Sequence, residues 1–264
     1  MYREWGIPEL GVLWRSSAGG APTVIPADGS ADVILRDDEL IIAGPSTRAL
    51  TGHGSVHGDT VGLRFAPGAA GLALRTNPAP LRDQQLCASE VVPKPVAHRA
   101  AALLRRLRDA DLMQPGRPEA LATFQDFVPL IRASADSGFA RAAAPWTIEV
   151  RHLASSGAPK YAAAQHLGYS ERQLQRRMLD HFGYGYTALR RVLRAERSQQ
   201  FLRSHLSPIA AARLAGYSDQ SHLTREFRVL VGTTPTQFAA AASAAAGRAA
   251  YTSMELPSGS STVE

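Results

Sequence analysis

The sequence predicts an α+β protein of several domains. A β-rich domain resembling a small barrel or sandwich comes first, two helices follow, and an all-α domain of two helix-turn-helix motifs joined by a long helix ends the fold. Three observations predict this order: short β-branched runs between turn residues, then apolar residues at helical spacing, then one helical pattern that occurs twice. The predicted boundaries are 1–95, 96–144, 145–240 and, for a disordered tail, 241–264.

The first predicted domain consists of short β-branched runs separated by turn signals. Turns are predicted at Pro26–Gly29, Arg36–Glu39 and Gly44–Pro45. They leave an all-β module with strands at Val12–Trp14, Thr23–Ile25, Asp32–Leu35, Leu40–Ala43 and Val61–Phe65.

Two amphipathic helices are predicted to follow the strands. Apolar residues recur at helical spacing over Ala97–Met113 and again over Pro118–Ala135. The segment Gly138–Pro145 is the predicted link to the C-terminal half.

The C-terminal half contains an internal repeat, Ala162–Glu171 and Ala210–Asp219. In each copy a small-residue helix should stop at a glycine, because glycine adopts a left-handed backbone cheaply. A serine, Ser170 or Ser218, then stands where a helix N-cap belongs, with an acidic residue beside it. The small alanines allow the close crossing of a helix-turn-helix motif. The offset between copies grows from 48 positions at the glycine to 49 beyond it, so the second copy has one extra residue.

The second helix of each copy has a buried and an exposed face. Leu174 with Met178, and Leu223 with Phe227, are spaced i, i+4 and should point inward. Side chains suited to base edges remain outside. They are Arg172, Gln173, Gln175 and Arg176 in the first copy and Gln220, Ser221, His222, Thr224 and Arg225 in the second. The alternative is an ordinary solvated helix face, which the repeat and its charge make less attractive.

Charge is divided unequally along the chain. Residues 1–144 hold 15 Lys+Arg and 15 Asp+Glu, whereas residues 145–264 hold 14 and 8, so the whole net charge of +6 lies in the C-terminal half. Basic side chains neutralise phosphates and release counterions, which makes DNA binding salt-dependent. The phosphate-contact candidates are Arg190, Arg191, Arg194, Arg197 and Arg228. Arginines on a joining helix also serve plain solubility, so both roles stay open.

The segments Ser207–Arg228 and Val231–Phe238 resemble the signature of AraC/XylS-type transcription regulators. With the upstream copy, the resemblance covers about 90 residues. It implies a seven-helix domain whose two recognition helices enter adjacent major grooves. It also implies base contacts by Arg172, Gln175 and Arg176 in the first copy and by Gln220, Ser221, His222 and Arg225 in the second.

The sequence departs from this family pattern at two positions. Tyr186 replaces a usual proline, which puts the start of the joining helix in doubt, and Ala239 replaces an arginine after the aromatic residue. A joining helix over residues 187–202 would run roughly 24 Å at about 1.5 Å per residue. Successive major grooves on one face lie about 34 Å apart, so with the lobes added this spacing is within reach.

The segments Ile25–Asp32 and Gly62–Ala70 resemble a β-rich N-terminal domain found on some AraC-type regulators. Such domains are expected to sense an effector or to pair subunits. Trp14, Asp28 and Arg64 are candidates for an effector pocket. In the alternative interpretation Asp28 caps a turn, Arg64 forms an internal ion pair and Trp14 fills the core.

Enzymatic function finds little support in the sequence. His53 and His57 have no acidic or cysteine partner at a ligand-like spacing, and nucleophile-elbow and phosphate-loop motifs are missing. Cys87 is the single cysteine and is expected to be buried and structural. We therefore expect no catalytic residues, no metal and no cofactor.

No apolar stretch approaches the ~20 residues of a membrane span, and the N-terminus lacks a signal-peptide core. A cytoplasmic location without membrane association is therefore expected. The function predicted is a sequence-specific DNA-binding transcription factor, modulated by an effector or by dimerisation through the N-terminal domain. Expected partners are double-stranded DNA, a small-molecule effector, a second copy of the chain and, for an activator, RNA polymerase. The alternative is an enzyme that binds or modifies a small molecule and carries an appended DNA-binding domain.

Overall fold

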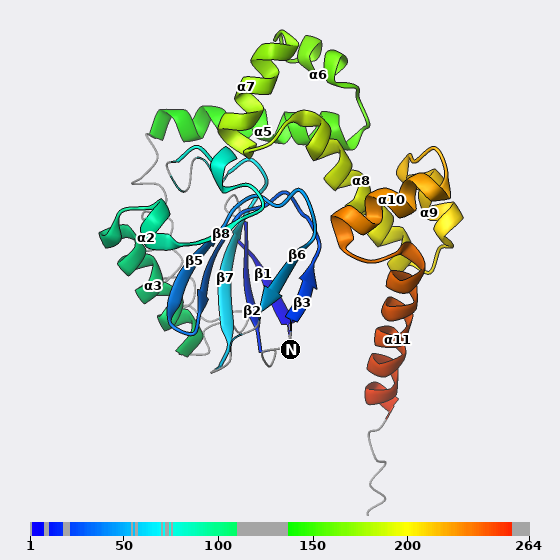
Figure 1. Cartoon of the computed structure of the whole chain (residues 1–264), viewed down its shortest axis with the longest axis horizontal. Coiled ribbons are helices and arrows are strands. Elements are labelled where there is room, and N and C mark those ends of the chain that lie inside the picture. The colour runs from blue at the N-terminus through cyan, green and yellow to red at the C-terminus, as the bar shows by residue number, and fades with distance from the viewer. Residues whose placement is uncertain are drawn as a thin grey trace, which may run out of the picture.

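The computed structural model of the 264-residue chain describes residues 2–7, 11–17, 22–53, 55, 58–69, 71, 74, 76–109 and 137–254. A β-rich domain lies beside two helical lobes, and one long helix runs between the lobes (Figure 1). This is the predicted order of a β-rich domain followed by an all-α region.

The β-rich domain is built on a six-stranded antiparallel sheet with the order β1-β2-β7-β4-β5-β8. A second sheet pairs β3 with β6 in antiparallel register. The strands are β1 Tyr2–Ile7, β2 Gly11–Ser16, β3 Pro22–Ile25, β4 Asp32–Arg36, β5 Glu39–Ala43, β6 Leu50–His53, β7 Thr60–Phe65 and β8 Gln85–Cys87.

The five predicted strands are all present, as β2, β3, β4, β5 and β7. The other three strands named here were not predicted, because their sequences lack the alternating, β-branched pattern typical of a strand. Tyr2–Ile7 carries charged residues, Leu50–His53 contains a glycine, and Gln85–Cys87 has only 3 residues. Each is placed by pairing with a neighbouring strand, which propensity does not encode.

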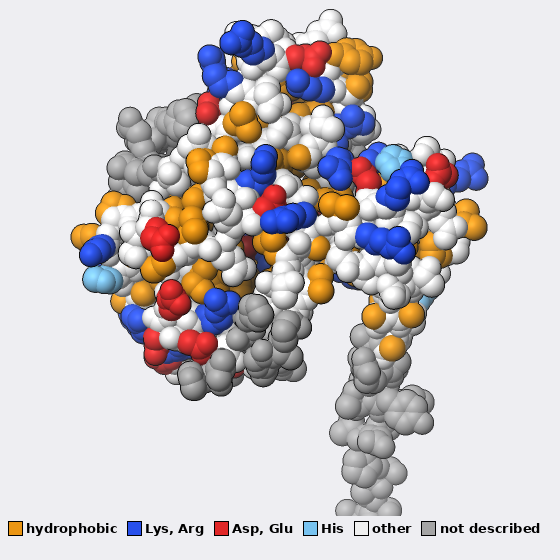
Figure 2. Space-filling view, in the orientation of Figure 1, with side chains coloured by type: hydrophobic (Ala, Val, Ile, Leu, Met, Phe, Trp, Pro, Cys, Tyr) orange, Lys and Arg blue, Asp and Glu red, His pale blue; other side chains and the backbone are white. Residues whose placement is uncertain are grey.

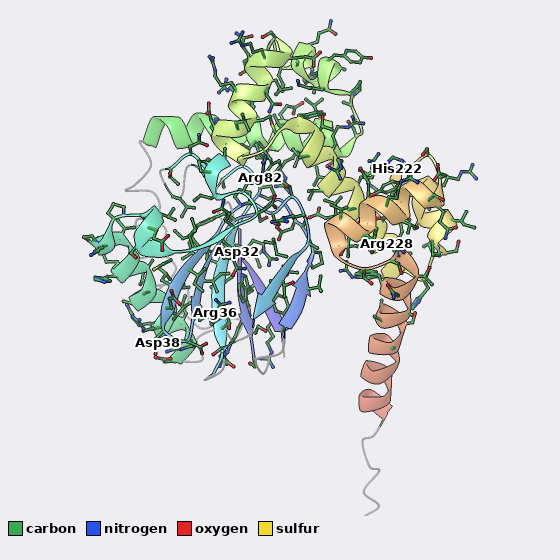
Figure 3. The ribbon with its side chains drawn as sticks, viewed as in Figure 1. Asp32, Arg36, Asp38, Arg82, His222 and Arg228 are labelled. Carbon is green, nitrogen blue, oxygen red and sulfur yellow. The ribbon has the colours of Figure 1, made fainter. Side chains whose placement is uncertain are left out.

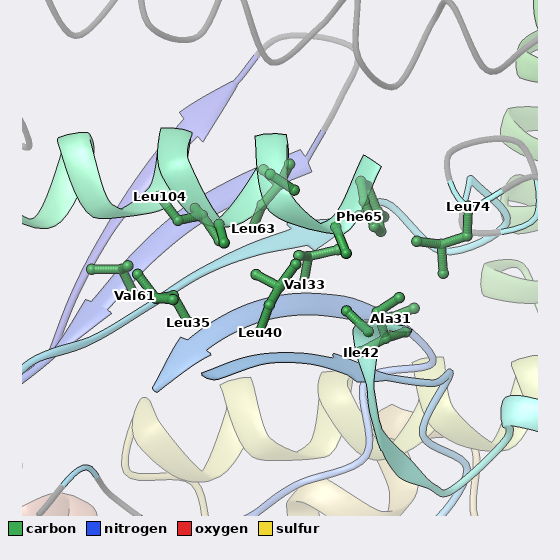
Figure 4. Packing of buried hydrophobic residues seen from close by; sticks show 14 of the residues in the cluster. Ala31, Val33, Leu35, Leu40, Ile42, Val61, Leu63, Phe65, Leu74 and Leu104 are labelled. Atoms are coloured by element: carbon green, nitrogen blue, oxygen red, sulfur yellow. The ribbon is translucent and has the colours of Figure 1, made fainter. Parts of the chain in front are cut away.

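One face of the large sheet packs against helix α3, Lys94–Asp109. Alternate residues along β4 and β7 point to this face, as the two-residue period of a strand requires. Leu35, Leu63 and Leu104 pack together in this core (Figure 4), and these three residues and Leu107 are at most 1% exposed. A short helix, α2 at Ala88–Val91, and the 3-10 turn η1 at Ala79–Leu81 complete the described part of the domain.

The predicted helix at Ala97–Met113 corresponds to α3, while the one at Pro118–Ala135 lies outside the described residues. The predicted link at Gly138–Pro145 is corrected by the structure. These residues belong to helix α5, Ser137–Ser155, which continues through Pro145. Alanines at 140 and 142–144 favour helix strongly enough to outweigh the one backbone bond that proline cannot make.

Seven helices, α5 to α11, form the described C-terminal region. The last, α11, continues to Met254, beyond residue 241 where a disordered tail was predicted, because the run that follows Phe238 is rich in alanine. The other helices are α6 Lys160–His166, α7 Glu171–Phe182, α8 Tyr186–Arg203, α9 Pro208–Ala215 and α10 Gln220–Val231.

Helix α8 contributes to two separate cores. Leu189 belongs to the core of the first lobe, α5 to α7, whereas Val192 and Leu202 belong to that of the second lobe, α9 to α11. The start of α8 was in doubt from the sequence because Tyr186 replaces a proline. The helix begins at Tyr186, whose ring is fully buried and whose hydroxyl donates to the Ala158 carbonyl at 3.1 Å.

Candidate nucleic-acid interface

The first helix-turn-helix motif joins α6 to α7 through a tight turn. Gly168 has φ +72°, in the left-handed region predicted for it. Ser170 is the N-cap of α7 and its hydroxyl accepts from the Gln173 amide at 3.2 Å. The Gln173 side chain accepts in return from the Ser170 amide at 2.8 Å, so two otherwise unpaired donors are satisfied by a capping box.

The second motif joins α9 to α10 in the same way, with Gly216 at φ +84°. Its cap differs from the prediction, because Asp219 and not Ser218 is the N-cap and accepts from the His222 amide at 2.7 Å. The extra residue of the second copy shifts the cap by one position. The His222 amide, followed by the Ser218 hydroxyl, holds the pKa of Asp219 below its usual value, so this carboxylate stays charged at the positive end of the helix dipole.

The inward faces of α7 and α10 are as predicted. Leu174, Met178, Leu223 and Phe227 are fully buried. Most predicted base-contact residues are exposed on the opposite faces: Arg172, Arg176, Gln220, Ser221 and Arg225. A hollow of about 360 Å³ beside the start of α7 is lined by Ser170, Arg172, Gln173 and Arg176.

Two of the predicted base-contact residues are half-buried. The Gln175 amide lies across the start of α8, so close to Gly185 that a Cβ added there would come within 2.9 Å of its oxygen. The His222 ring lies 5.2 Å from the Tyr217 ring, and its Nδ1 is 3.1 Å from the Ser218 hydroxyl. His222 and Arg228 are both on α10 (Figure 3), and the Arg228 side chain is exposed.

Two arginines of α8 are bound to recognition helix α10 through one carboxylate. Arg191 Nε and Arg194 Nη2 lie 2.8 Å and 2.6 Å from the two oxygens of Glu226, whose side chain is 14% exposed. The Arg194 guanidinium also covers the Tyr217 ring at 4.4 Å. Glu226 was not singled out from the sequence, because its partners are more than 30 positions away.

Two more arginines of α8 contact the end of α5 and the turn that follows it. Arg190 donates to the Gly157 carbonyl at 2.8 Å, and Arg197 donates to the Ser155 carbonyl. The last carbonyls of a helix have no partner within it, so the Arg197 bond satisfies the carbonyl at the end of α5, while the Arg190 bond holds the turn after it. In both lobes the arginines of α8 thus hold neighbouring helices. Each guanidinium has five donors, so further donors remain for phosphates.

A second arginine–tyrosine contact occurs in the first lobe. Arg177 lies 5.1 Å from the Trp146 ring and 5.1 Å from the Tyr169 ring, and it donates to the Tyr169 hydroxyl. Tyr169 and Tyr217 are equivalent residues of the repeat, so each helix-turn-helix turn carries a tyrosine under an arginine. In the same lobe, the pKa of His181 is lowered, mainly because the imidazole is buried and secondly because of the positive charge of Arg177.

Comparison with known proteins agrees with this geometry. Residues 163–241 match a family model described as a helix-turn-helix domain. The matched segment includes both helix-turn-helix motifs, from within α6 to the first residues of α11.

Searches with the whole chain found no curated relative and several solved structures of low identity. ToxT from Vibrio cholerae O395 is 12% identical, over 86% of this chain and 95% of its own, with a TM-score of 0.45. A structure of the same protein bound to (E)-4-(8-methylnaphthalen-1-yl)but-3-enoic acid is 10% identical, over 90% and 98% of the two chains, with a TM-score of 0.45.

Basic side chains gather over both helical lobes on the face shown in Figure 2. Acidic and basic side chains are mixed on the β-rich domain in the same view, as the division of charge along the sequence implies. The surface of the lobes is therefore the part of the molecule best suited to phosphates.

In the β-rich domain, the three pocket candidates lie together on the face of the sheet opposite α3. Arg64 Nε is 3.0 Å from Asp28 Oδ2 and 3.3 Å from Asp32 Oδ1. Trp14 is 9% exposed and its indole donates to Asp32 at 2.7 Å. Asp28 accepts from the Ser30 amide at 2.9 Å, the bond of a turn cap. These are the contacts described in the alternative interpretation, and an effector role for the cluster stays a prediction.

Asp32 is the member of this cluster that the sequence did not reveal. It stands opposite Arg64 in the β4–β7 register, where a short strand pair brings distant residues together. Burial raises the pKa of Asp32 to about 6, although Arg64 and the Trp14 indole act in the opposite direction. Figure 3 labels Asp32 on the sheet.

The remaining candidates add no chemistry that the structure describes. His57 and the side chain of His53 lie outside the described residues, and no metal-binding cluster occurs within the part described. Cys87 is half-buried and not fully buried as expected, with its sulfur 3.1 Å from the Ser89 hydroxyl. Of the helices in the described ranges, none is both long enough and apolar enough to cross a membrane.

Proposed function

We propose that the chain is a sequence-specific transcription factor that inserts α7 and α10 into adjacent major grooves on one face of duplex DNA. The observation that carries this proposal is the attachment of both lobes to one unbroken helix. Helix α8 has 18 residues, roughly 27 Å at about 1.5 Å per residue. Recognition helices fixed at two places on such a helix suit grooves that repeat about every 34 Å.

In this proposal base edges are read by Arg172, Gln175 and Arg176 of α7 and by Gln220, Ser221, His222 and Arg225 of α10. Phosphates are contacted by Arg228 and by those donors of Arg190, Arg191, Arg194 and Arg197 that the internal contacts leave over. Arginine discriminates guanine by bidentate bonds, whereas phosphate contacts add affinity to every sequence alike.

The β-rich domain supplies regulation in this proposal, through a small-molecule effector at the Trp14, Asp28 and Arg64 cluster or through pairing of two chains. Contact with RNA polymerase follows if the protein activates transcription, and action on chromosomal DNA implies a cytoplasmic location. The effector interpretation is supported by the grouping of Asp28, Asp32 and Arg64, because titratable groups gathered in one place are typical of functional sites.

The test is footprinting of the full chain on DNA from its own upstream region, followed by selection of duplexes from a random pool. Protection over about two helical turns is expected. Arg225→Ala should weaken the free energy of binding to the selected duplex by about 1–3 kcal/mol and relax the preference at one base pair.

The matched control is Arg213→Ala, because Arg213 is an exposed arginine of α9 and not of a recognition helix. It should leave every base preference unchanged. Equal losses for Arg225→Ala on selected and random duplexes would show that Arg225 does not read a base. Selection that enriches no sequence at all would contradict the proposed function.

A further inference from the structure

A short loop of the β-rich domain is hydrogen-bonded to both helical lobes. The Ala27 amide donates to the Leu230 carbonyl of α10 at 2.7 Å, in the second lobe. Two residues later, the Gly29 carbonyl accepts from the Tyr184 hydroxyl at 2.9 Å, between α7 and α8 of the first lobe. The loop, Pro26–Ser30, follows directly after β3, on the side of the β-rich domain that faces α10 (Figure 1).

At the second lobe the loop closes the end of a recognition helix. Leu230 and Val229 are in the last turn of α10, where carbonyls have no partner within the helix. The Ala27 amide donates to the Leu230 carbonyl, and the Ala49 amide donates to the Val229 carbonyl at 2.8 Å. Ala27 is 1% exposed and packs into the core of this lobe with Val192 and Ala195. The β-rich domain therefore caps α10 and does not merely touch it.

At the first lobe the contact is equally close. Tyr184 is fully buried, and its ring packs edge-on against Phe182 of the lobe core. Gly29 has φ +69°, and a Cβ at this position would lie 2.2 Å from the Tyr184 hydroxyl oxygen. Only glycine satisfies both the backbone conformation and the close approach.

The loop itself is held rigidly between these two contacts. Asp28 accepts from the Ser30 amide at 2.9 Å and from the Ser46 hydroxyl at 3.1 Å, and its other oxygen lies 3.0 Å from Arg64. The Gly29 amide donates to the Ser46 carbonyl at 3.0 Å. A segment with its backbone and side chain bonded on both sides resists bending better than a free loop.

We propose that the Pro26–Ser30 loop sets the distance and angle between the two recognition helices, with Asp28 and Tyr184 as positioning residues for DNA binding. Helix α8 joins the lobes directly, and a single helix can bend or twist along its length. The loop, with the Ala49 contact beside it, connects the lobes at a second place through the β-rich domain. This proposal rests on the proposed function, since it assumes that both helices read one duplex.

The loop should not affect which bases the protein prefers. It should affect how strongly binding depends on the separation of the two DNA half-sites. A rigid pair of lobes binds tightly only where two half-sites have the correct separation, because a preorganised protein loses little entropy on binding there. A loosened pair binds the correct separation less tightly and incorrect separations nearly as well. The readout is therefore the ratio of affinities for the selected duplex and for the same duplex with one or two base pairs inserted between half-sites.

The test compares Tyr184→Phe with Tyr186→Phe in the full chain. Both tyrosines are fully buried, but the Tyr186 hydroxyl donates within the first lobe and not to the β-rich domain. Tyr184→Phe should reduce the spacing ratio about five-fold, the equivalent of one buried hydrogen bond. Tyr186→Phe should keep the wild-type ratio. Equal ratios for the two variants would overturn the proposal.

A second measurement needs no DNA and separates this proposal from the function on which it rests. Amide hydrogen exchange of the free full-length protein should show Ala27 and Ala49 protected in wild type, with faster exchange at Ala27 in Tyr184→Phe. Exchange of both wild-type amides at the rate of an unstructured peptide would overturn the proposal. If no duplex is enriched but this protection is found, the proposed function fails while the loop still holds the lobes.

Discussion

Replacing Glu226 by glutamine should destabilise the protein and at the same time strengthen its binding to random DNA. Glutamine keeps the size of the side chain and one acceptor, but it removes the negative charge that Arg191 and Arg194 share. The two arginines are then free to approach phosphates. Opposite changes in stability and in nonspecific affinity are unusual for one substitution, which makes the pair of measurements diagnostic.

The size of the stability loss follows from the exposure of the partners. A hydrogen bond to a charged group contributes about 1.5–3 kcal/mol when it is shielded from solvent. Arg194 has a side chain 23% exposed, so its bond approaches this range, whereas Arg191 at 39% is screened and contributes nearer 0.5 kcal/mol. Because glutamine can retain one of the bonds, we expect a loss of about 1–2 kcal/mol in the free energy of unfolding.

The assay pairs urea unfolding with binding to a random duplex across a range of salt concentrations. Each phosphate newly contacted should steepen the plot of log affinity against log salt by about 0.9. Glu171→Gln is the control, since Glu171 forms an exposed ion pair with Lys160 at 3.3 Å and should change stability by less than about 1 kcal/mol. The interpretation of Glu226 is refuted if Glu226→Gln matches this control in both measurements.

Two further predictions concern stability. Gly216→Ala should lower the free energy of unfolding by about 1 kcal/mol. Gly216 has φ +84° and an added Cβ would meet nothing within 4 Å, so the loss comes from backbone strain alone. An unchanged free energy of unfolding in chemical denaturation would contradict this prediction. Burial, and secondarily the charge of Asp28, raises the pKa of Glu196 to about 7 from 4.5, and burial raises that of Asp32 to about 6 from 3.8. The folded protein retains these protons at pH values where the unfolded chain has lost them, so the free energy of unfolding should fall as pH rises from about 4 to about 7 and level off above. Glu196→Gln should remove most of the fall between pH 5 and 7, and an unchanged profile would show that this carboxyl does not titrate there.

The helix-turn-helix region was predictable because its signals are local. Gly168 and Gly216 end helices, Ser170 caps one, and Leu174 and Met178 follow the period of a helix, so each feature depends on residues a few positions apart. The cap of α10 was mispredicted for the same reason. One added residue moved the cap from Ser218 to Asp219, and both residue types are good caps, so local preference did not distinguish them.

The β-rich domain was less predictable because its short strands depend on their partners. β8 has 3 residues and forms only because β5 lies beside it. The contact between Trp14 and Gly62 likewise arises from register, since the indole occupies the space that a side chain at Gly62 would fill.

The sequence by itself determined that two helix-turn-helix motifs are present, which faces of their helices are buried, and that the positive charge lies with them. Only the tertiary structure decided which charged groups are paired and how the β-rich domain meets the lobes. Glu226 is joined to Arg191 across 35 positions, and the Tyr184 hydroxyl to the Gly29 carbonyl across 155. Periodicity and capping act over a few residues, whereas ion pairs and interdomain bonds form wherever packing brings distant residues within about 3 Å.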